Sequence, residues 1–225
     1  MRARRIVCAS DAAAAESCAQ EMLTLIAAAR HANGRANIAI SGGSSPKPMF
    51  AKMAAAGFDW TGVDIFFVDE RCVPPTDSES NYKMANEHLL QPARIPPAQV
   101  HRILGEIDPH EAARQYAAGL PHAFDVIHRG IGPDAHTASL FPGEPLIDDR
   151  ANLTAATYAA KFNQWRVTLL PAVLLAAKHT VVLASGADKA EALAHVFGPE
   201  HNEKKYPGQI GIQEDIEMTW YVTSE

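Results

Sequence analysis

The chain has 225 residues, 47% of them hydrophobic, and a formal net charge of −6. This length and balance are typical of one globular α/β domain, so we expect residues 1–225 to form a single domain. The negative charge, with no basic run beyond the N-terminal arginines, argues against a nucleic-acid partner. No apolar stretch approaches the roughly 18 residues that cross a bilayer, and no apolar segment follows those arginines, so we expect a cytoplasmic protein without membrane contact.

The first part of the chain alternates strand-like and helical patterns. An apolar run at residues 5–9 predicts a strand, and an alanine-rich helix capped by Ser10 or Asp11 follows to about Arg30. A second buried strand at residues 37–40 breaks into a glycine-serine turn before a proline. Ser45 is therefore the expected N-cap of the next helix, over residues 47–56.

The glycine-serine turn consists of Ser41, Gly42, Gly43, Ser44 and Ser45. A turn of this kind before a helix offers free backbone N–H groups and the positive end of the helix dipole, which together favour a phosphate. From the turn alone, a tight connection without a ligand is about equally compatible with the sequence.

The apolar run at residues 63–68 is typical of a strand inside a parallel sheet, and it ends in Asp69, Glu70 and Arg71. Such a charged cluster can be a solvated rim. A guanidinium at the same edge of the sheet as the glycine-serine turn would instead suit a doubly charged phosphate. Asn81 begins a helix expected over residues 81–90, either as its cap or as a substrate contact.

The stretch at residues 124–143, FDVIHRGIGPDAHTASLFPG, joins an apolar strand-like run to a polar loop. Gly130 and Gly132 allow the chain to turn there, which would place Asp134 and His136 at the rim of the sheet. An aspartate two residues before a histidine can orient the imidazole, which titrates near neutrality and can accept a proton from water.

The rest of the chain continues the same alternation. Strands are expected at 100–103, 152–158, 165–170, 180–184 and 218–222, and helices at 109–120, 171–178 and 189–197. This order predicts a three-layer α/β/α fold with a mainly parallel, Rossmann-like sheet. Ligands of such folds bind outside the carboxyl ends of the strands, where the polar loops lie.

Three blocks of the chain resemble the 6-phosphogluconolactonase family, within the wider group that includes the glucosamine-6-phosphate deaminases. GIGPDAHTASLFPG is similar to the family's GxGxDGHTASLFPG, and SGGSSP at 41–46 is similar to SGGSTP. VDERCVP at 68–74, followed by Ser80 and Asn81, is similar to the family's DER, VP and SN elements. The resemblance implies hydrolysis of 6-phosphoglucono-1,5-lactone to 6-phosphogluconate, in the oxidative pentose phosphate pathway.

The resemblance also implies roles for individual residues. His136 corresponds to the family's histidine and is expected to act as the general base on the attacking water, with Asp134 orienting it. Asp69 is expected to face the sugar hydroxyls or the carbonyl end. The expected substrate- and phosphate-binding residues are Gly42, Gly43, Ser44, Ser45, Arg71, Asn81, Arg166 and Lys189.

The resemblance leaves open which of Arg166, Lys161 and Lys189 contacts the phosphate. The ligand implied is a small sugar phosphate, and no metal or organic cofactor is implied. Cys8, Cys18 and Cys72 are odd in number and widely spaced, so disulfide and zinc interpretations are both weak. We expect a monomer or a small homo-oligomer.

The chain departs from the family pattern in three places. Ala135 stands where the family has glycine; if this position needs a positive φ, alanine costs about 1–2 kcal/mol and can shift His136. His128 and Arg129 replace apolar residues, and Arg129 could point at the site or at the surface. The approach KFNQW at 161–165 lacks the family's prolines.

Two other functions are compatible with parts of the pattern. A glucosamine-6-phosphate deaminase shares the turn and the D-x-H element, but DER with VP and HTASLFPG favour the lactonase. A non-catalytic sugar-phosphate-binding module is a second alternative, against which the presence of His136 argues. Ser139 is expected to be structural rather than nucleophilic, because no G-x-S-x-G motif is present.

Overall fold

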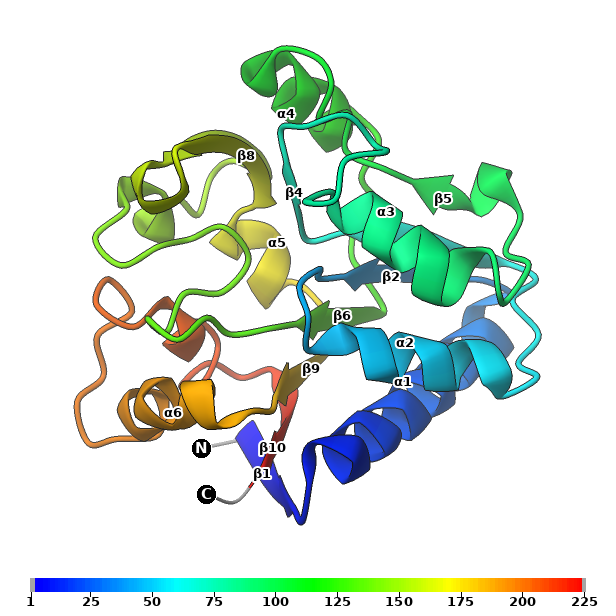
Figure 1. Cartoon of the computed structure of the whole chain (residues 1–225), viewed down its shortest axis with the longest axis horizontal. Helices are drawn as coiled ribbons and strands as arrows, with labels where there is room; N and C mark the ends of the chain where they lie inside the picture. The colour runs from blue at the N-terminus through cyan, green and yellow to red at the C-terminus, as the bar shows by residue number, and fades with distance from the viewer. Residues whose placement is uncertain (1–2, 224–225) are drawn as a thin grey trace.

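The computed structural model describes residues 3–223. Its central sheet has seven strands, and all six neighbouring pairs in it are parallel (Figure 1). In sheet order the strands are β1 (Ala3–Cys8), β10 (Glu217–Thr223), β9 (His179–Ala184), β6 (Val126–Arg129), β2 (Ala36–Ile40), β3 (Val63–Phe67) and β5 (Val100–His101). The mainly parallel sheet expected from the sequence is confirmed.

Alternating side chains of the sheet pack into two different clusters. On β9, Val181 and Leu183 belong to the cluster that contains residues of helix α1 (Asp11–Asn33), whereas Val182 belongs to a second cluster with residues of α6 (Ala190–Val196). Because successive side chains of a strand point to opposite faces, helices cover both faces of the sheet. The three-layer α/β/α arrangement is therefore confirmed.

A second sheet of three antiparallel strands was not predicted. It consists of β4 (Asp69–Arg71), β8 (Gln164–Leu169) and β7 (Thr154–Ala159), in that order. Only Val68 separates β3 of the first sheet from β4 of the second. Its N–H donates to the carbonyl of Ile40 in β2, and its own carbonyl accepts from the N–H of Leu169 in β8, so Val68 joins the two sheets.

The remaining helices follow the sequence pattern with shifted ends. They are α2 (Pro46–Ala55), α3 (Asn81–Ala85), α4 (Pro109–Ala118) and α5 (Pro171–Leu175). The helix expected over residues 81–90 is α-helical only in its first half and continues as a π-helix over Asn86–Leu90. Short 3-10 turns occupy Pro97–Gln99, Pro145–Asp148, Ala160–Phe162, Ala187–Lys189 and Pro207–Gln209.

Ser10 and Ser45 hold the N-cap positions expected from the sequence, but only Ser10 makes a capping hydrogen bond with its side chain. Ser10 caps α1, since its hydroxyl accepts from the N–H of Ala13 at 3.2 Å. Ser45 precedes α2 as expected but has helical dihedral angles and makes no capping hydrogen bond with its side chain. Asn81 is not a cap, because Ser80 holds that position and accepts from the N–H of Lys83.

Arg129 points neither at the site nor at the surface, so both alternatives drawn from the sequence are wrong. Its side chain is completely buried at the end of β6, and it donates to the carbonyl of Ile210 at 2.9 Å. Burial lowers the pKa of Arg129 to about 10, and the carboxylate of Glu203 opposes this shift. The guanidinium thus ties the central strand to the chain segment that precedes β10.

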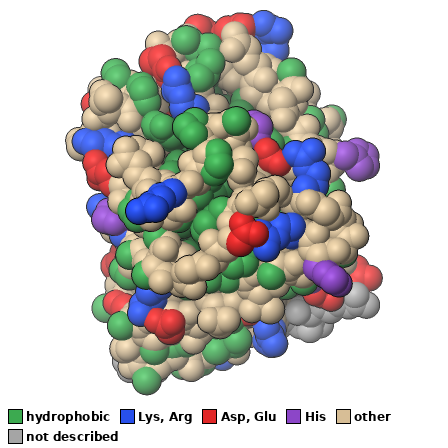
Figure 2. Space-filling view, turned by 90° about the vertical axis from the view of Figure 1, so that its right-hand side faces the viewer, with side chains coloured by type: hydrophobic (Ala, Val, Ile, Leu, Met, Phe, Trp, Pro, Cys, Tyr) green, Lys and Arg blue, Asp and Glu red, His purple; other side chains and the backbone are tan. Residues whose placement is uncertain are grey.

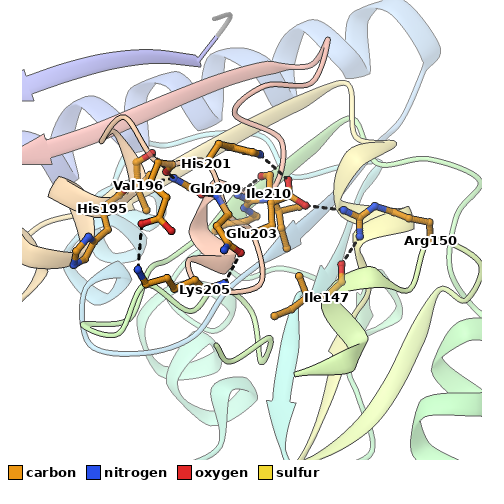
Figure 3. A network of polar contacts seen from close by, with 12 residues as sticks. Ile147, Arg150, His195, Val196, His201, Glu203, Lys205, Gln209 and Ile210 are labelled. Carbon is orange, nitrogen blue, oxygen red and sulfur yellow. Dashed lines mark hydrogen bonds and ion pairs between the residues drawn. The ribbon is translucent and has the colours of Figure 1, made fainter. Parts of the chain in front are cut away.

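That segment is held together by the side chain of Gln209 (Figure 3). Its amide nitrogen donates to the carbonyls of Glu200 at 2.8 Å and His195 at 3.1 Å, and its oxygen accepts from the N–H of Asn202. Arg150 connects the same segment to the turn at 145–148 through Glu203 (Figure 3). An irregular stretch with these internal bonds can serve as a fixed support.

On the face seen in Figure 2, Lys and Arg side chains are scattered among acidic and hydrophobic ones. Within residues 3–223, no helix is both long enough and apolar enough to span a bilayer.

The two serines at helix starts allow a matched test of capping. We expect Ser10→Ala to lower the free energy of unfolding by about 1 kcal/mol, because the substitution removes the acceptor for an N–H group of α1. Ser45→Ala should change it by far less, since its hydroxyl caps nothing. Urea unfolding followed by circular dichroism measures both, and an equal loss in the two variants would contradict this assignment of caps.

Candidate active site

A pocket of about 170 Å³ lies at the carboxyl ends of β2, β3 and β6. Every site residue expected from the sequence lines it except Asp134, which contacts His136 instead. The lining residues are Ser41 to Pro46, Asp69, Arg71, Asn81, Gly130 to Pro133, His136, Ala138, Arg166 and Lys189. A larger hollow of about 680 Å³ lies between the end of β1 and α6, but its lining is mainly apolar or small.

The glycine-serine turn is shaped by close contact with Asn81. A Cβ atom on Gly42 would lie 1.9 Å from Oδ1 of Asn81, so no residue larger than glycine fits there. Gly43 has a φ of +101°, which other residues rarely adopt. The side-chain amide of Asn81 donates to the carbonyl of Asp69 at 2.9 Å, and this bond ties the start of α3 to β4.

Two arginines lie opposite each other on neighbouring strands of the second sheet. Arg71 of β4 pairs in register with Arg166 of β8, and both line the pocket. The Nε atoms of both side chains are buried without a hydrogen-bond partner. Burial lowers the pKa of Arg166; Asp69 opposes this shift and Arg71 adds to it. Like charges directly opposite one another are destabilising, so this end of the pocket is prepared for an anion.

The position of Arg166 is fixed by aromatic rings. Its guanidinium carbon lies 4.8 Å from the ring centroid of Phe162 and 5.6 Å from that of Phe141. Arg71 is held from another side, since its Nη1 donates to the carbonyl of Glu79 at 2.5 Å. The two guanidinium groups are therefore oriented before any ligand arrives.

Glu70 has a structural role that the sequence did not reveal. Its carboxylate is 3% exposed and accepts hydrogen bonds from the N–H groups of Arg71, Asn81 and Tyr82 and from the hydroxyl of Ser80. Burial raises the pKa of Glu70, and the three backbone N–H groups oppose that shift. Glu70 thus fixes β4 against the first turn of α3. In the sequence, the only indication of this role is that Glu70 stands between two expected site residues, Asp69 and Arg71.

Asp69 lies beside Ser139 at the bottom of the pocket. The Ser139 hydroxyl donates to its Oδ2 at 2.7 Å, and the side chain of Asn81 donates to its Oδ1 at 3.3 Å. Ser139 is completely buried and does not line the pocket. The expectation that this serine is structural agrees with its position.

His136 and Asp134 form a hydrogen-bonded pair. Nδ1 of His136 lies 2.5 Å from Oδ1 of Asp134, which leaves Nε2 as the nitrogen available to a ligand. A Cβ atom on Gly132 would lie 2.0 Å from Cε1 of His136, so the ring also needs a glycine beside it. Although burial acts to raise it, hydrogen bonds with His136 and Lys161 hold the pKa of Asp134 well below its usual range.

Ala135 adopts a φ of +63°, as the departure from the family's glycine suggested. Its side chain is 1% exposed and belongs to the cluster that covers the α6 face of the sheet. Its carbonyl accepts from the N–H of Gly208 at 2.7 Å. The segment organised by Gln209 therefore braces the loop that carries His136.

The two lysines differ in their placement. Lys189 lines the pocket, and its amine pairs with the carboxylate of Asp188 at 2.8 Å. Lys161 does not line the pocket. Its amine lies 3.2 Å from Oδ2 of Asp134, on the far side of that carboxylate from His136.

Comparison with known proteins finds relatives that match most of the chain. The 6-phosphogluconolactonase of Synechocystis sp. is 34% identical over 203 residues, which cover 85% of this chain and 83% of the relative. The human 6-phosphogluconolactonase is 34% identical over 228 residues, 94% of this chain and 86% of the relative. The crystal structure of a protein called devB, 33% identical, superposes with a TM-score of 0.86 over 99% of this chain and 97% of its own.

The family model described as glucosamine-6-phosphate isomerases/6-phosphogluconolactonase matches residues 9–220. With the relatives covering most of its length, the chain belongs to the glucosamine-6-phosphate isomerase/6-phosphogluconolactonase family.

Proposed function

We propose that the protein hydrolyses 6-phospho-D-glucono-1,5-lactone to 6-phospho-D-gluconate, a step of the oxidative pentose phosphate pathway. Its curated relatives carry the name 6-phosphogluconolactonase, which favours this reaction over deamination of glucosamine 6-phosphate. The observation that carries the proposal is one pocket with paired guanidinium groups and a hydrogen-bonded Asp–His pair. The guanidinium groups suit the phosphate of a sugar phosphate, and the Asp–His pair suits the attack of water on its reactive carbonyl.

The phosphate group of the substrate would bind between Arg71 and Arg166. Both guanidinium groups line the pocket and would donate to the phosphate oxygens, and the N–H groups of Gly43 to Ser45 would add donors at the start of α2. Lys189 adds a third cation to the same pocket. Binding through the phosphate fixes the far end of the sugar, which then presents its lactone carbonyl to the rest of the pocket.

His136 would act as the general base. Its Nε2 takes a proton from a water molecule while the water oxygen forms a bond to the lactone carbonyl carbon. The resulting tetrahedral intermediate collapses with cleavage of the bond between C1 and the ring oxygen, and the imidazolium returns its proton to that oxygen. The product carboxylic acid then releases its proton to solvent.

Asp134 and Asp69 would support this reaction in different ways. Asp134 accepts from Nδ1 of His136, which selects the tautomer with a free Nε2 and stabilises the imidazolium. Asp69 lies in the pocket with one oxygen bound to the Ser139 hydroxyl, and it would contact the sugar hydroxyls. No covalent intermediate is needed, because a lactone is an activated ester.

Replacing the base tests the mechanism. We expect His136→Ala to lower the enzymatic rate by about 10²- to 10⁴-fold, because the substitution removes the proposed acceptor of the water's proton. The measurement is acid released from freshly prepared lactone, corrected for spontaneous hydrolysis. His122→Ala, which removes an exposed histidine outside the pocket, is the matched control. Equal rates in wild type and His136→Ala would refute the general-base role.

Ala135 gives a second test. We expect Ala135→Gly to preserve or raise turnover, because glycine accepts the positive φ of +63° without strain. The same acid-release assay, run at saturating lactone, measures the effect. A marked loss would show instead that the buried methyl group of Ala135 is needed to hold the loop.

A further inference from the structure

The tip of the hairpin between β7 and β8 contacts both ends of the active site. The tip consists of the 3-10 turn Ala160–Phe162 and Asn163, whose φ of +49° reverses the chain. The hydroxyl of Tyr158 donates to the side chain of Asn163, which closes the hairpin. The conformation of the tip is therefore defined by its own residues.

Phe162 connects the tip to the arginine end of the pocket. Its ring packs at 5.9 Å from that of Phe141 and lies under the guanidinium of Arg166. Phe141 in turn packs at 4.6 Å from the imidazole of His136. Contacts through the rings of Phe162 and Phe141 therefore connect Arg166 to His136.

Lys161 connects the tip to the other end. Its amine lies 3.2 Å from Oδ2 of Asp134, whose Oδ1 is 2.5 Å from Nδ1 of His136. The carboxylate is thereby held from both sides, and a rotation that broke its bond to His136 would also break the bond to Lys161. The side chain of Lys161 is 59% exposed, whereas those of Asp134 and His136 are only 27% and 18% exposed. The lysine therefore reaches from solvent to a partly buried carboxylate.

We propose that Lys161 is a positioning residue for the reaction: it fixes the orientation of Asp134 toward His136 and offsets the carboxylate's charge, which keeps the imidazole unprotonated and able to act as a base. This inference rests on the proposed lactonase function. The positioning role needs no contact between Lys161 and the substrate, and Lys161 is not among the residues that line the pocket.

The charges around His136 set the sign of the expected effect. Asp69 of β4 is the anion that shares the pocket with the imidazole; Arg71 of β4, Arg166 of β8 and Lys189 before α6 are its cations. Asp134 lies behind the ring, and its pKa is held well below the usual range, so it stays ionised at any pH near neutrality. Without the cation of Lys161, the carboxylate of Asp134 stabilises the imidazolium form of His136 more strongly. We therefore expect His136 to be protonated at a higher pH in a variant that lacks this lysine.

The test is the pH dependence of kcat/KM, measured by lactone hydrolysis from about pH 5 to 8, where a histidine titrates. The acid limb of this profile is the range in which kcat/KM falls as the pH decreases. We expect Lys161→Met to move the acid limb to a pH about half a unit higher, which is the effect of one partly solvated charge, and to leave KM unchanged. Lys161→Arg should keep the wild-type limb. Lys178→Met removes a lysine of similar exposure that pairs with Asp125 outside the pocket, and it is the matched control.

Two results would overturn the inference while leaving the lactonase function intact. An unchanged acid limb in Lys161→Met would show that the ion pair does not act on His136. A tenfold rise in KM without movement of the limb would show that Lys161 binds the substrate directly. Failure of the wild-type protein to exceed spontaneous hydrolysis would overturn the proposed function itself.

Discussion

The pairing of β4 with β8 is the constraint on which the site depends. It begins one residue after β3 leaves the parallel sheet, and it places Arg71 directly opposite Arg166. Two guanidinium groups held this close repel one another, so the fold must hold them by other contacts. Glu70 supplies some of those contacts, because its carboxylate joins β4 to the start of α3 through three hydrogen bonds. A phosphate bound between them, as proposed, would relieve this repulsion.

The loop that carries His136 depends on a part of the chain far from it in sequence. Its residue Ala135 has a strained backbone and is held by the N–H of Gly208. Gly208 belongs to the segment that Gln209 holds together and that the buried Arg129 ties to β6. A rigid support of this kind would suit the general-base role proposed for His136, because small displacements of a base from its water reduce the rate strongly.

Local patterns predicted the parallel sheet, the glycine-serine turn and the Asp134–His136 pair, because each is a property of a few consecutive residues. The second sheet could not be predicted in this way, since β4 is only three residues long and shows no periodicity. The burial of Arg129 was missed because a charged residue at a strand end normally faces solvent. Asn81 was one residue away from the true cap, Ser80, and only the tertiary contact with Asp69 shows its position.

The central claim is that one end of the pocket holds a phosphate while the other end holds the reacting carbon. The most direct measurement is a crystal structure of the protein with 6-phosphogluconate. The account predicts the phosphate between the guanidinium groups of Arg71 and Arg166, with the carboxylate carbon within reach of Nε2 of His136. A phosphate bound beside His136, or a product bound outside this pocket, would contradict it.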